Sequence, residues 1–485
     1  MNIEEFREFG KASVDYIADY FENIRKIDVI SKVEPGYLKT KLPENVPPTG
    51  EPWQKVLQDV DRVIVPGLTH WHSPHFHAYF PTANSFPGIV GELFLSGLGC
   101  LSKDWDSNPA CIELEVRMMD WLAKILGLPG EFLNSSEGPG GGVIQNAASE
   151  STLVGLLCGK QRALRDTLKQ HPNLDETYII PKLVAYTSKE SNSSIEKAGL
   201  LASVTMRLLP TDKNGSLRGD VLLEAIIRDK DDGLIPCCVV ATLGTTGSCA
   251  FDNLDELGRV CSNGGIWLHV DAAYAGAAFA CPEYRYLMKG IENVDSFNFN
   301  PHKWMLVNSD CSAMWFKNTK DVERAFKVKA TLPKIPSFKP ELEHWQIPTS
   351  RRFRALKLWF VLRIYGIEGI QKHIRQQISL AKFFEHLARI WGLSALDLGG
   401  EDSLTQELLD EISRRNKIFL MPYYYREKLV VRFVICSRFT EKSDILYAWR
   451  EILSLVKHEE PYIHNSDKDF TNGKSESQDA EKKNT

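Results

Sequence analysis

Short apolar runs alternate with helical patterns through the middle of the chain, from about residue 113 onward. The runs predict strands at 182–186, 203–209, 235–243, 266–271, 294–299 and 311–316. Such alternation predicts an α/β fold with a largely parallel sheet that is covered on both faces. Ligands bind at the carboxyl ends of the strands in sheets of this kind, so residues directly after each strand are the candidate site residues.

The two ends of the chain follow other patterns. Apolar residues recur at helical spacing over 4–26 and again over 52–64, and a Pro-rich link joins the two stretches. Such an arm lacks a core of its own, and the pattern leaves open whether it packs on its own chain or on a second subunit. A helix over 345–388 and a strand over 428–436 predict a smaller C-terminal α+β domain.

The connecting segments complete the predicted organisation. A helix is predicted at 113–128, a flexible glycine-rich turn at 137–142 and a further helix from 147 to 157. The segment 317–343 has three prolines and many lysines, which is typical of a mobile lid or a disordered connection. The predicted units are an N-terminal arm at 1–85, a large domain at 86–347, a small domain at 348–457 and a disordered tail at 458–485.

Composition narrows the class of protein. Lys+Arg of 58 against Asp+Glu of 63 gives a net charge of -5, which offers no electrostatic reason for a nucleic-acid partner. No run of 18 apolar residues is present, and the N-terminus lacks a hydrophobic signal segment, so neither membrane insertion nor secretion is expected. None of the ten cysteines is spaced Cys-x-x-Cys, which favours reduced thiols and a cytoplasmic protein.

Two segments, His269–Ala275 and Ser296–Trp304, place polar groups directly after apolar strands. Taken singly, Asp271 is typical of a turn or helix cap, and Lys303 of a solvated lysine. Together they supply an acid for a protonated ring nitrogen and an amine that forms an imine, which are the two groups a pyridoxal phosphate site requires. Backbone N–H groups at the helix that follows Asn146 can bind the phosphate.

Several longer motifs make the sequence resemble the group II pyridoxal-phosphate-dependent decarboxylases, and specifically their aromatic L-amino acid decarboxylase branch. The resemblance covers residues 1 to about 457. Its motifs are His70-Trp-His-Ser-Pro74, Ala78-Tyr-Phe-Pro-Thr82, Gly140-Gly-Gly-Val-Ile-Gln145, His269-Val-Asp-Ala-Ala-Tyr-Ala-Gly276, Asn298-Phe-Asn-Pro-His-Lys-Trp304 and His344-Trp-Gln-Ile-Pro348. The resemblance implies an aspartate-aminotransferase-like fold (fold type I) and a homodimer whose subunits share each active site, with the N-terminal arm in the dimer contact.

The resemblance also implies roles for individual residues. Lys303 matches the lysine that binds the cofactor covalently, Asp271 matches the partner of the ring nitrogen, and His302 lies near the reacting centre. The other implied cofactor contacts are Ala148, Ser149, Thr246, Ala273 and Asn300. The implied pocket for an aromatic substrate comprises Trp71, Tyr79, Phe80, Pro81 and Thr82.

Two departures from the decarboxylases bear on the reaction. Asn192 stands where the family has a ring-stacking histidine, and an amide cannot act as an acid or a base. The segment 317–343 contains no tyrosine, although the decarboxylases use a lid tyrosine to protonate the substrate carbon after carbon dioxide leaves. Without either acid, protonation is slow and dioxygen can take the electrons, giving peroxide and an imine that hydrolyses to an aldehyde and ammonia.

In this respect the sequence is similar to the insect aromatic acetaldehyde synthases, which prefer L-DOPA and are associated with flexible cuticle. Two alternatives stay open: an aromatic decarboxylase that releases dopamine or a related amine, and a non-catalytic scaffold that keeps the cofactor fold. Lys103 and Asp104 replace an aromatic and a small residue of the family. About a dozen family residues are absent around 387–398, which puts an edge strand of the small domain in doubt.

Overall fold

A computed structural model describes residues 1–80, 82–327, 340–390 and 402–456 of the chain. Its centre is a seven-stranded sheet in the order β1-β7-β6-β5-β4-β2-β3. The strands are β1 (Gly141–Gln145), β2 (Leu183–Ser188), β3 (Thr205–Leu209), β4 (Ile235–Thr242), β5 (Trp267–Asp271), β6 (Ser296–Phe299) and β7 (Ser312–Phe316). β7 is antiparallel to both neighbours, and the remaining pairs are parallel. The predicted mostly parallel sheet is therefore confirmed.

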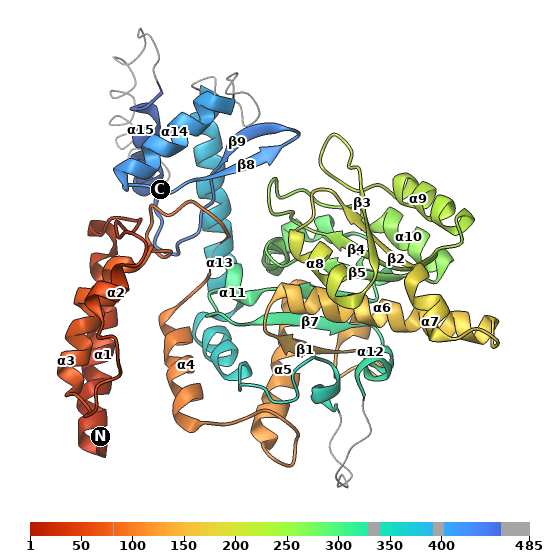
Figure 1. Cartoon of the computed structure of the whole chain (residues 1–485), viewed down its shortest axis with the longest axis horizontal. Helices are drawn as coiled ribbons and strands as arrows, with labels where there is room; N and C mark the ends of the chain where they lie inside the picture. Colours follow the sequence, from red (N-terminus) through yellow and green to blue (C-terminus); the bar gives the residue numbers. More distant parts are fainter. Residues whose placement is uncertain (81, 328–339, 391–401, 457–485) are drawn as a thin grey trace, which may run out of the picture.

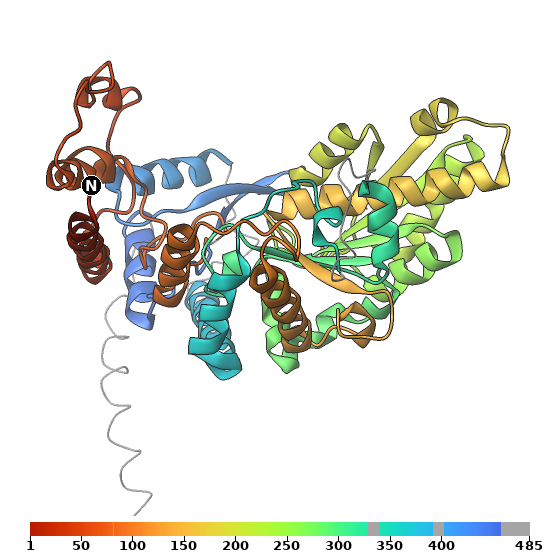
Figure 2. The ribbon, with the colours of Figure 1, turned by 90° about the horizontal axis from the view of Figure 1, so that it is seen from below.

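Helices cover both faces of this sheet, as Figures 1 and 2 show. They are α5 (Pro109–Leu126), α6 (Ala148–Gln170), α7 (Glu176–Ile179), α8 (Ser193–Ala202), α9 (Gly219–Asp231), α10 (Leu254–Gly264), α11 (Pro301–Trp304) and α12 (Thr319–Phe326). Alternate residues of β4 serve the two faces: Cys238 and Val240 pack in one core cluster, and Val239 and Ala241 in the other. Because helices cover both faces, residues of both orientations are buried. A continuous apolar run therefore marks such a strand in the sequence.

The two ends of the chain lie beside the large domain. The N-terminal part comprises α1 (Ile3–Asn23), α2 (Tyr37–Lys41), α3 (Trp53–Asp59) and α4 (Phe86–Leu98), and α1 to α3 stand away from the sheet (Figure 1). The C-terminal part comprises α13 (Ala355–Ile390), α14 (Asp402–Arg415), β8 (Met421–Tyr425), β9 (Lys428–Arg432) and α15 (Lys442–Leu453). The β8–β9 hairpin extends from this small domain toward the large sheet (Figure 1).

Three local predictions need correction. The last two residues of the stretch predicted as a turn at 137–142 already belong to β1, which pairs with β7. The helix predicted from residue 345 begins only at Ala355 and is interrupted at Gly366, whose φ is 63°. The strand predicted over 428–436 ends at Arg432, and the chain beyond it is irregular.

Some sequence predictions lie beyond the described part of the chain. They concern residues 328–339 of the lid, residues 391–398 of the shortened stretch at 387–398, and the tail.

Among the described helices, none combines the length and apolar character needed to cross a membrane. All ten cysteines are free thiols.

Candidate active site

The loops after β2, β4, β5 and β6 meet the N-terminus of α6 at a pocket of about 280 Å³. This is the carboxyl edge of the parallel strands, where the sequence places the candidate chemistry. The pocket is lined by every predicted catalytic and cofactor-binding residue: Ala148, Ser149, Asn192, Thr246, Asp271, Ala273, Asn300, His302 and Lys303. Phe80, from the predicted substrate set, lines it as well.

Lys303 and Asp271 are buried charges that influence each other. Burial lowers the pKa of the Lys303 amine, an effect that nearby Asp271 opposes. Burial raises the pKa of the Asp271 carboxyl, and the Lys303 ammonium and the Ala273 N–H, 2.9 Å from Asp271 Oδ1, oppose that rise. A lysine with a lowered pKa is more often the neutral amine that attacks a carbonyl. The pair therefore has the properties required of an imine-forming lysine and its acidic partner.

Asn192 is fixed by both ends of its amide. It is the N-cap of α8, and its Oδ1 accepts a hydrogen bond from the Ser194 N–H at 3.0 Å. Its Nδ2 donates to Thr246 Oγ1 at 2.9 Å, which connects the loop after β2 to the loop after β4. The pocket wall at this position is thus an oriented carboxamide that has no titratable proton near neutral pH.

The opposite end of the pocket suits an anion. Ala148 and Ser149 are the first residues of the 23-residue helix α6, and no side chain caps the first turn of this helix. Exposed N–H groups and the helix dipole both favour a phosphate there. Nearby, Asn300 Oδ1 and Thr242 Oγ1 are buried and have no hydrogen-bond partner among the described residues. Unused polar atoms beside an imine-forming lysine and an acid fit a bound aldehyde that carries a ring and a phosphate.

The comparison with protein families decides the class. The family model described as the pyridoxal-dependent decarboxylase conserved domain matches residues 35–391. The chain belongs to this family. It is 52% identical over 465 residues to the aromatic-L-amino-acid decarboxylase of Manduca sexta, covering 93% of this chain and 92% of that protein. It is 50% identical over 469 residues to the 3,4-dihydroxyphenylacetaldehyde synthase of Drosophila melanogaster, with 94% and 92% covered.

Solved structures agree with this assignment. The crystal structure of Oryza sativa TDC with PLP and tryptamine superposes with a TM-score of 0.89 at 33% identity. That match covers 94% of this chain and 98% of the TDC chain. The protein is thus a decarboxylase with the group II pyridoxal-phosphate fold, and its cofactor is pyridoxal 5'-phosphate.

His302 of this decarboxylase has a fixed ring orientation. Its Nδ1 accepts a hydrogen bond from the Cys311 N–H at 2.8 Å, so the ring proton resides on Nε2. Burial and the neighbouring Lys303 lower the pKa of the His302 imidazole to about 4. At neutral pH the side chain is therefore an uncharged hydrogen-bond donor to the pocket.

The predicted substrate residues divide into two groups. Phe80 stacks on Tyr274 with ring centroids 4.2 Å apart, inside the pocket. Trp71 and Tyr79 stack on each other at 5.1 Å but do not line the cavity formed by this single chain. Thr82 likewise is not a lining residue, and Pro81 lies outside the described residues.

Sequence reasoning missed several lining residues, among them Tyr274, Ser194, Gly244 and Thr242. Tyr274 was detectable, since it stands three positions after Asp271 in the same strand-end motif. Ser194 and Thr242 carried no signal, because single hydroxyl residues near a strand end are common in any fold.

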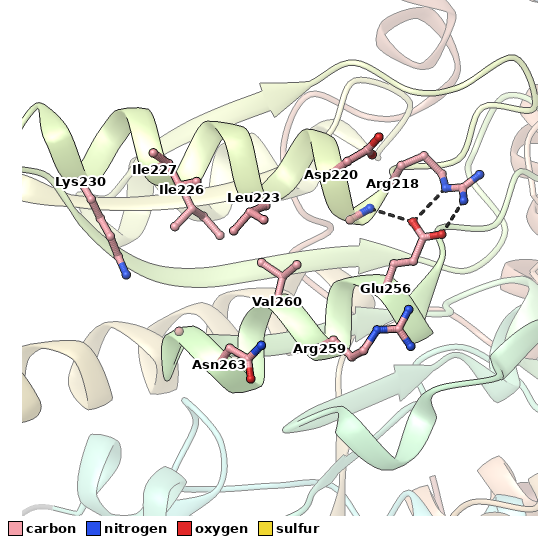
Figure 3. A pocket seen from close by; sticks show the side chains of 12 residues that line it. Arg218, Asp220, Leu223, Ile226, Ile227, Lys230, Glu256, Arg259, Val260 and Asn263 are labelled. Atoms are coloured by element: carbon pink, nitrogen blue, oxygen red, sulfur yellow. Dashed lines mark hydrogen bonds and ion pairs between the residues drawn. The ribbon is translucent and has the colours of Figure 1, made fainter.

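The decarboxylase has a second, larger groove, of about 660 Å³, between α9 and α10 (Figure 3). Leu223 and Val260 line its apolar part, and Arg218 pairs with Glu256 at its rim through Nε and Oε2, 3.0 Å apart. None of the predicted site residues lines this groove. The smaller pocket, which brings the lysine and the acid together, is therefore the candidate active site.

Proposed function

We propose that this enzyme oxidatively decarboxylates and deaminates an aromatic amino acid, with L-DOPA as the preferred substrate. The balanced reaction is L-DOPA + O2 + H2O → 3,4-dihydroxyphenylacetaldehyde + CO2 + NH3 + H2O2. The observation that carries the proposal is Asn192, whose amide is held by Ser194 and Thr246 at the pocket wall. An amide at this position can hydrogen-bond but cannot deliver a proton.

The class of substrate is supported by the relatives and by the pocket. The similar proteins include enzymes named for aromatic amino acids and for a dihydroxyphenyl aldehyde. Phe80 and Tyr274 line the pocket and stack at 4.2 Å, and the buried Trp304 ring stacks behind Tyr274 at 4.9 Å. These rings give the pocket an aromatic wall that supports an aromatic substrate.

The residues of the chain have separate tasks. When bound, pyridoxal phosphate supplies an aldehyde that condenses with amines and a ring that accepts electrons as carbon dioxide leaves. Lys303 provides the amine for this condensation, favoured by its lowered pKa. Asp271 would accept a hydrogen bond from the protonated ring nitrogen, and the start of α6 would bind the phosphate.

The small domain helps to shield the pocket. The Arg432 guanidinium lies over the Phe80 ring at 4.4 Å, and its Nη2 donates to the Tyr79 carbonyl at 3.1 Å. Lys303 Nζ lies 4.9 Å from the centroid of the same Phe80 ring. Phe80 is thus held between the two domains, where it limits the access of water to the lysine.

Asn192 affects which product forms, because a proton and dioxygen compete for the electrons left after loss of carbon dioxide. A positioned acid accelerates proton transfer about 10²–10⁴-fold, and its absence prolongs the electron-rich state. With the cofactor bound, dioxygen would take two electrons and two protons to give hydrogen peroxide, and water would replace the amino nitrogen, so that ammonia and the aldehyde leave. A pocket that lacks this acid therefore favours aldehyde over amine.

A second candidate function is plain decarboxylation to an amine such as dopamine. The observation in its favour is His302, which lines the pocket and carries its ring proton on Nε2. Its pKa of about 4 makes the neutral ring a weak acid, so we expect slow protonation by this route.

The test replaces Asn192 with histidine and with glutamine, and measures aldehyde and amine in one sample. Asn192→His introduces an acid with a pKa near neutrality, so the amine fraction is expected to rise at least tenfold and to decline as the pH rises above about 6.5. Asn192→Gln is the matched control, because it keeps an amide of similar chemistry. An amine fraction that stays at the wild-type level in Asn192→His contradicts the proposal, as does an equal rise in both variants.

We also propose that the enzyme is a homodimer with shared active sites. Large apolar side chains are exposed along α1 and α4, including Phe6, Leu93, Phe94 and Leu98. Trp71 and Tyr79, two of the expected substrate residues, stack on each other outside the single-chain cavity. Several large apolar side chains exposed on neighbouring turns of a helix are typical of a protein interface.

A further inference from the structure

Four polar side chains form a compact block on one face of the central sheet. Asp271 is the register partner of Asn298, and His269 is the register partner of Ser296, on the adjacent parallel strands β5 and β6. Side chains two residues apart on a strand lie on the same face, so all four project to the same side. All four are buried, and a Cβ added to Gly155 of α6 would lie 2.8 Å from the His269 ring. Helix α6 therefore seals the block from water.

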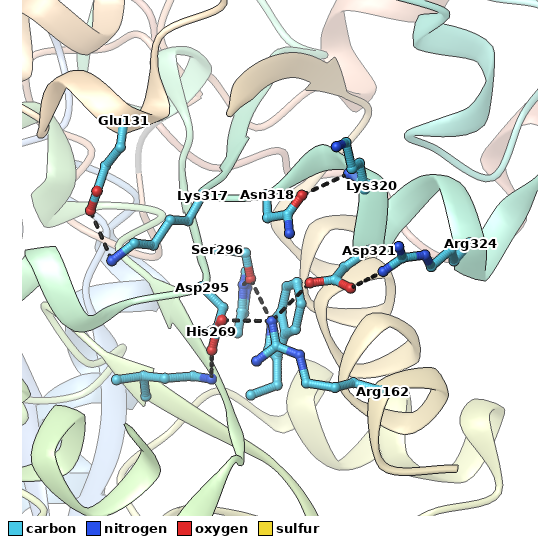
Figure 4. A network of polar contacts seen from close by, with 12 residues as sticks. Glu131, Arg162, His269, Asp295, Ser296, Lys317, Asn318, Lys320, Asp321 and Arg324 are labelled. Carbon is cyan, nitrogen blue, oxygen red and sulfur yellow. Dashed lines mark hydrogen bonds and ion pairs between the residues drawn. The ribbon is translucent and has the colours of Figure 1, made fainter. Parts of the chain in front are cut away.

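The hydrogen bonds of this block have a definite direction. The Trp267 Nε1–H donates to Ser296 Oγ at 2.9 Å, and Ser296 Oγ lies 2.8 Å from His269 Nδ1. Figure 4 shows His269 and Ser296 beside Arg162 and Asp295. An indole only donates, so Ser296 accepts from it and has its own proton left for His269 Nδ1. Burial lowers the pKa of His269 to about 4, and the single proton of the neutral ring is then on Nε2.

Asn298 is the group between this donor and Asp271. His269 Nε2 and both polar atoms of the Asn298 amide are buried without a standard hydrogen-bond partner in the described ranges. Burial raises the pKa of Asp271 and lowers the pKa of His269, and interaction with Asn298 opposes both shifts. An amide oxygen that faces the histidine and an amide nitrogen that faces the carboxylate would give all three of these unpartnered atoms a partner.

We propose that His269 and Asn298 are positioning residues that keep Asp271 ionised beneath the cofactor ring. His269 Nε2–H donates to Asn298 Oδ1, and Asn298 Nδ2–H donates to the Asp271 carboxylate. The inference rests on the role of Asp271 given under the proposed function. Lys303, the cation beside Asp271 in this chain, would be held in an imine once the cofactor is bound, whereas an Asn298 donor would stay unchanged.

The variants separate this relay from simple packing. Asn298→Asp keeps the size of the side chain but places a second acid beside Asp271, and Asn298→Leu removes both polar atoms. Ser296→Ala removes the partner of His269 Nδ1. Ser312→Ala is its matched control, because Ser312 is equally buried on the neighbouring strand and loses a hydrogen bond to Ser151 of 3.0 Å. Asp271→Asn is the reference for complete loss of the carboxylate.

The readouts need neither substrate nor dioxygen, so they are independent of which product the enzyme makes. Apoenzyme is titrated with pyridoxal 5'-phosphate, and the absorbance of the bound cofactor is followed against pH. We expect Asn298→Asp to weaken cofactor binding at least tenfold. Because Asp271 is ionised only above its pKa, raising that pKa should also move the acid transition of the spectrum upward by about one pH unit.

The serine variants are expected to have smaller effects. Ser296→Ala should weaken cofactor binding about threefold, and Ser312→Ala should leave it unchanged. Wild-type binding and titration in Asn298→Asp, together with a loss in Asp271→Asn, would overturn the relay alone. Wild-type behaviour in Asp271→Asn would overturn the role of Asp271 and the relay with it. Equal losses in the two serine variants would show general packing and contradict the relay, even if the Asn298 variants fail to fold.

Discussion

Asn192 combines a structural and a chemical role in one side chain. Its side-chain oxygen caps the N-terminus of helix α8, and its side-chain nitrogen donates a hydrogen bond to the Thr246 hydroxyl at 2.9 Å. Asparagine is among the preferred N-cap residues, whereas histidine is not one of them. Asn192 thus connects the loops after β2 and β4, and it supplies no acidic proton to the pocket.

Substitution of Thr246 tests whether its hydroxyl holds the Asn192 amide in place. Thr246→Val keeps the shape of the side chain but removes the acceptor of Asn192 Nδ2, so the amide is expected to lose its fixed orientation. We expect kcat/KM for consumption of the amino acid to fall about tenfold, equivalent to roughly 1.4 kcal/mol. Thr246→Ser retains the hydroxyl and should stay within about twofold of wild type. Steady-state kinetics measure kcat/KM of both variants. Equal losses in Thr246→Val and Thr246→Ser would contradict a positioning role for the hydroxyl.

Prediction from sequence worked best for residues in strand-end motifs. Asp271 and Lys303 are recognisable because an acid and a lysine follow two buried strands in the right order. The hydrogen bond from Asn192 to Thr246 was not predictable, since it depends on how two loops 54 positions apart approach each other. Trp71 was expected at the substrate, yet its ring packs with Tyr79 outside the single-chain pocket.

Among the elements, β1 shows why close packing can hide a strand. A Cβ on Gly141 would lie 2.8 Å from the Trp345 ring, and one on Gly142 would lie 2.5 Å from the Trp315 ring. The strand therefore requires glycine where β-branched residues normally mark a strand, and its sequence looks like a turn. Strands β2, β4, β5, β6 and β7 were predictable because their side chains are buried on both faces, whereas β3 is mostly exposed.

The β8–β9 hairpin is a second element that sequence alone did not place. Tyr423 packs so closely on Gly247, next to Thr246, that an added Cβ would lie 1.9 Å from the ring. The Tyr423 hydroxyl also donates to Glu190 at 3.4 Å, two positions before Asn192. One aromatic residue of the small domain thus contacts both loops that carry the Asn192–Thr246 hydrogen bond.

Gly247→Ala is expected to displace the hairpin, because the methyl group and the Tyr423 ring cannot occupy the same space. We expect kcat/KM to fall about tenfold or more. The double variant Gly247→Ala/Tyr423→Ala removes the clash and should recover part of that loss relative to Gly247→Ala. Kinetics of the single and double variants measure this, and a double variant less active than Gly247→Ala would contradict the account.

At the scale of the whole molecule, the exposed apolar surface of α1 and α4 predicts self-association. Leu98→Asp and Phe94→Asp place a charge on this surface, where the side chains are 61% and 49% exposed in the single chain. We expect both variants to sediment as monomers at micromolar concentration and to lose most activity, because the sites are shared. Leu200→Asp, at an exposed leucine of α8, is the control and should leave the mass unchanged. A wild-type chain that sediments as a monomer would contradict the shared site.

The central claim is that loss of carbon dioxide is followed by oxidation rather than protonation. The most direct test incubates the cofactor-loaded wild-type enzyme with L-DOPA in air and quantifies dioxygen uptake, hydrogen peroxide, aldehyde and dopamine in the same sample. The account predicts dioxygen, peroxide and aldehyde in a ratio of about one to one to one, with aldehyde well above dopamine. Dopamine formed without dioxygen uptake would contradict it.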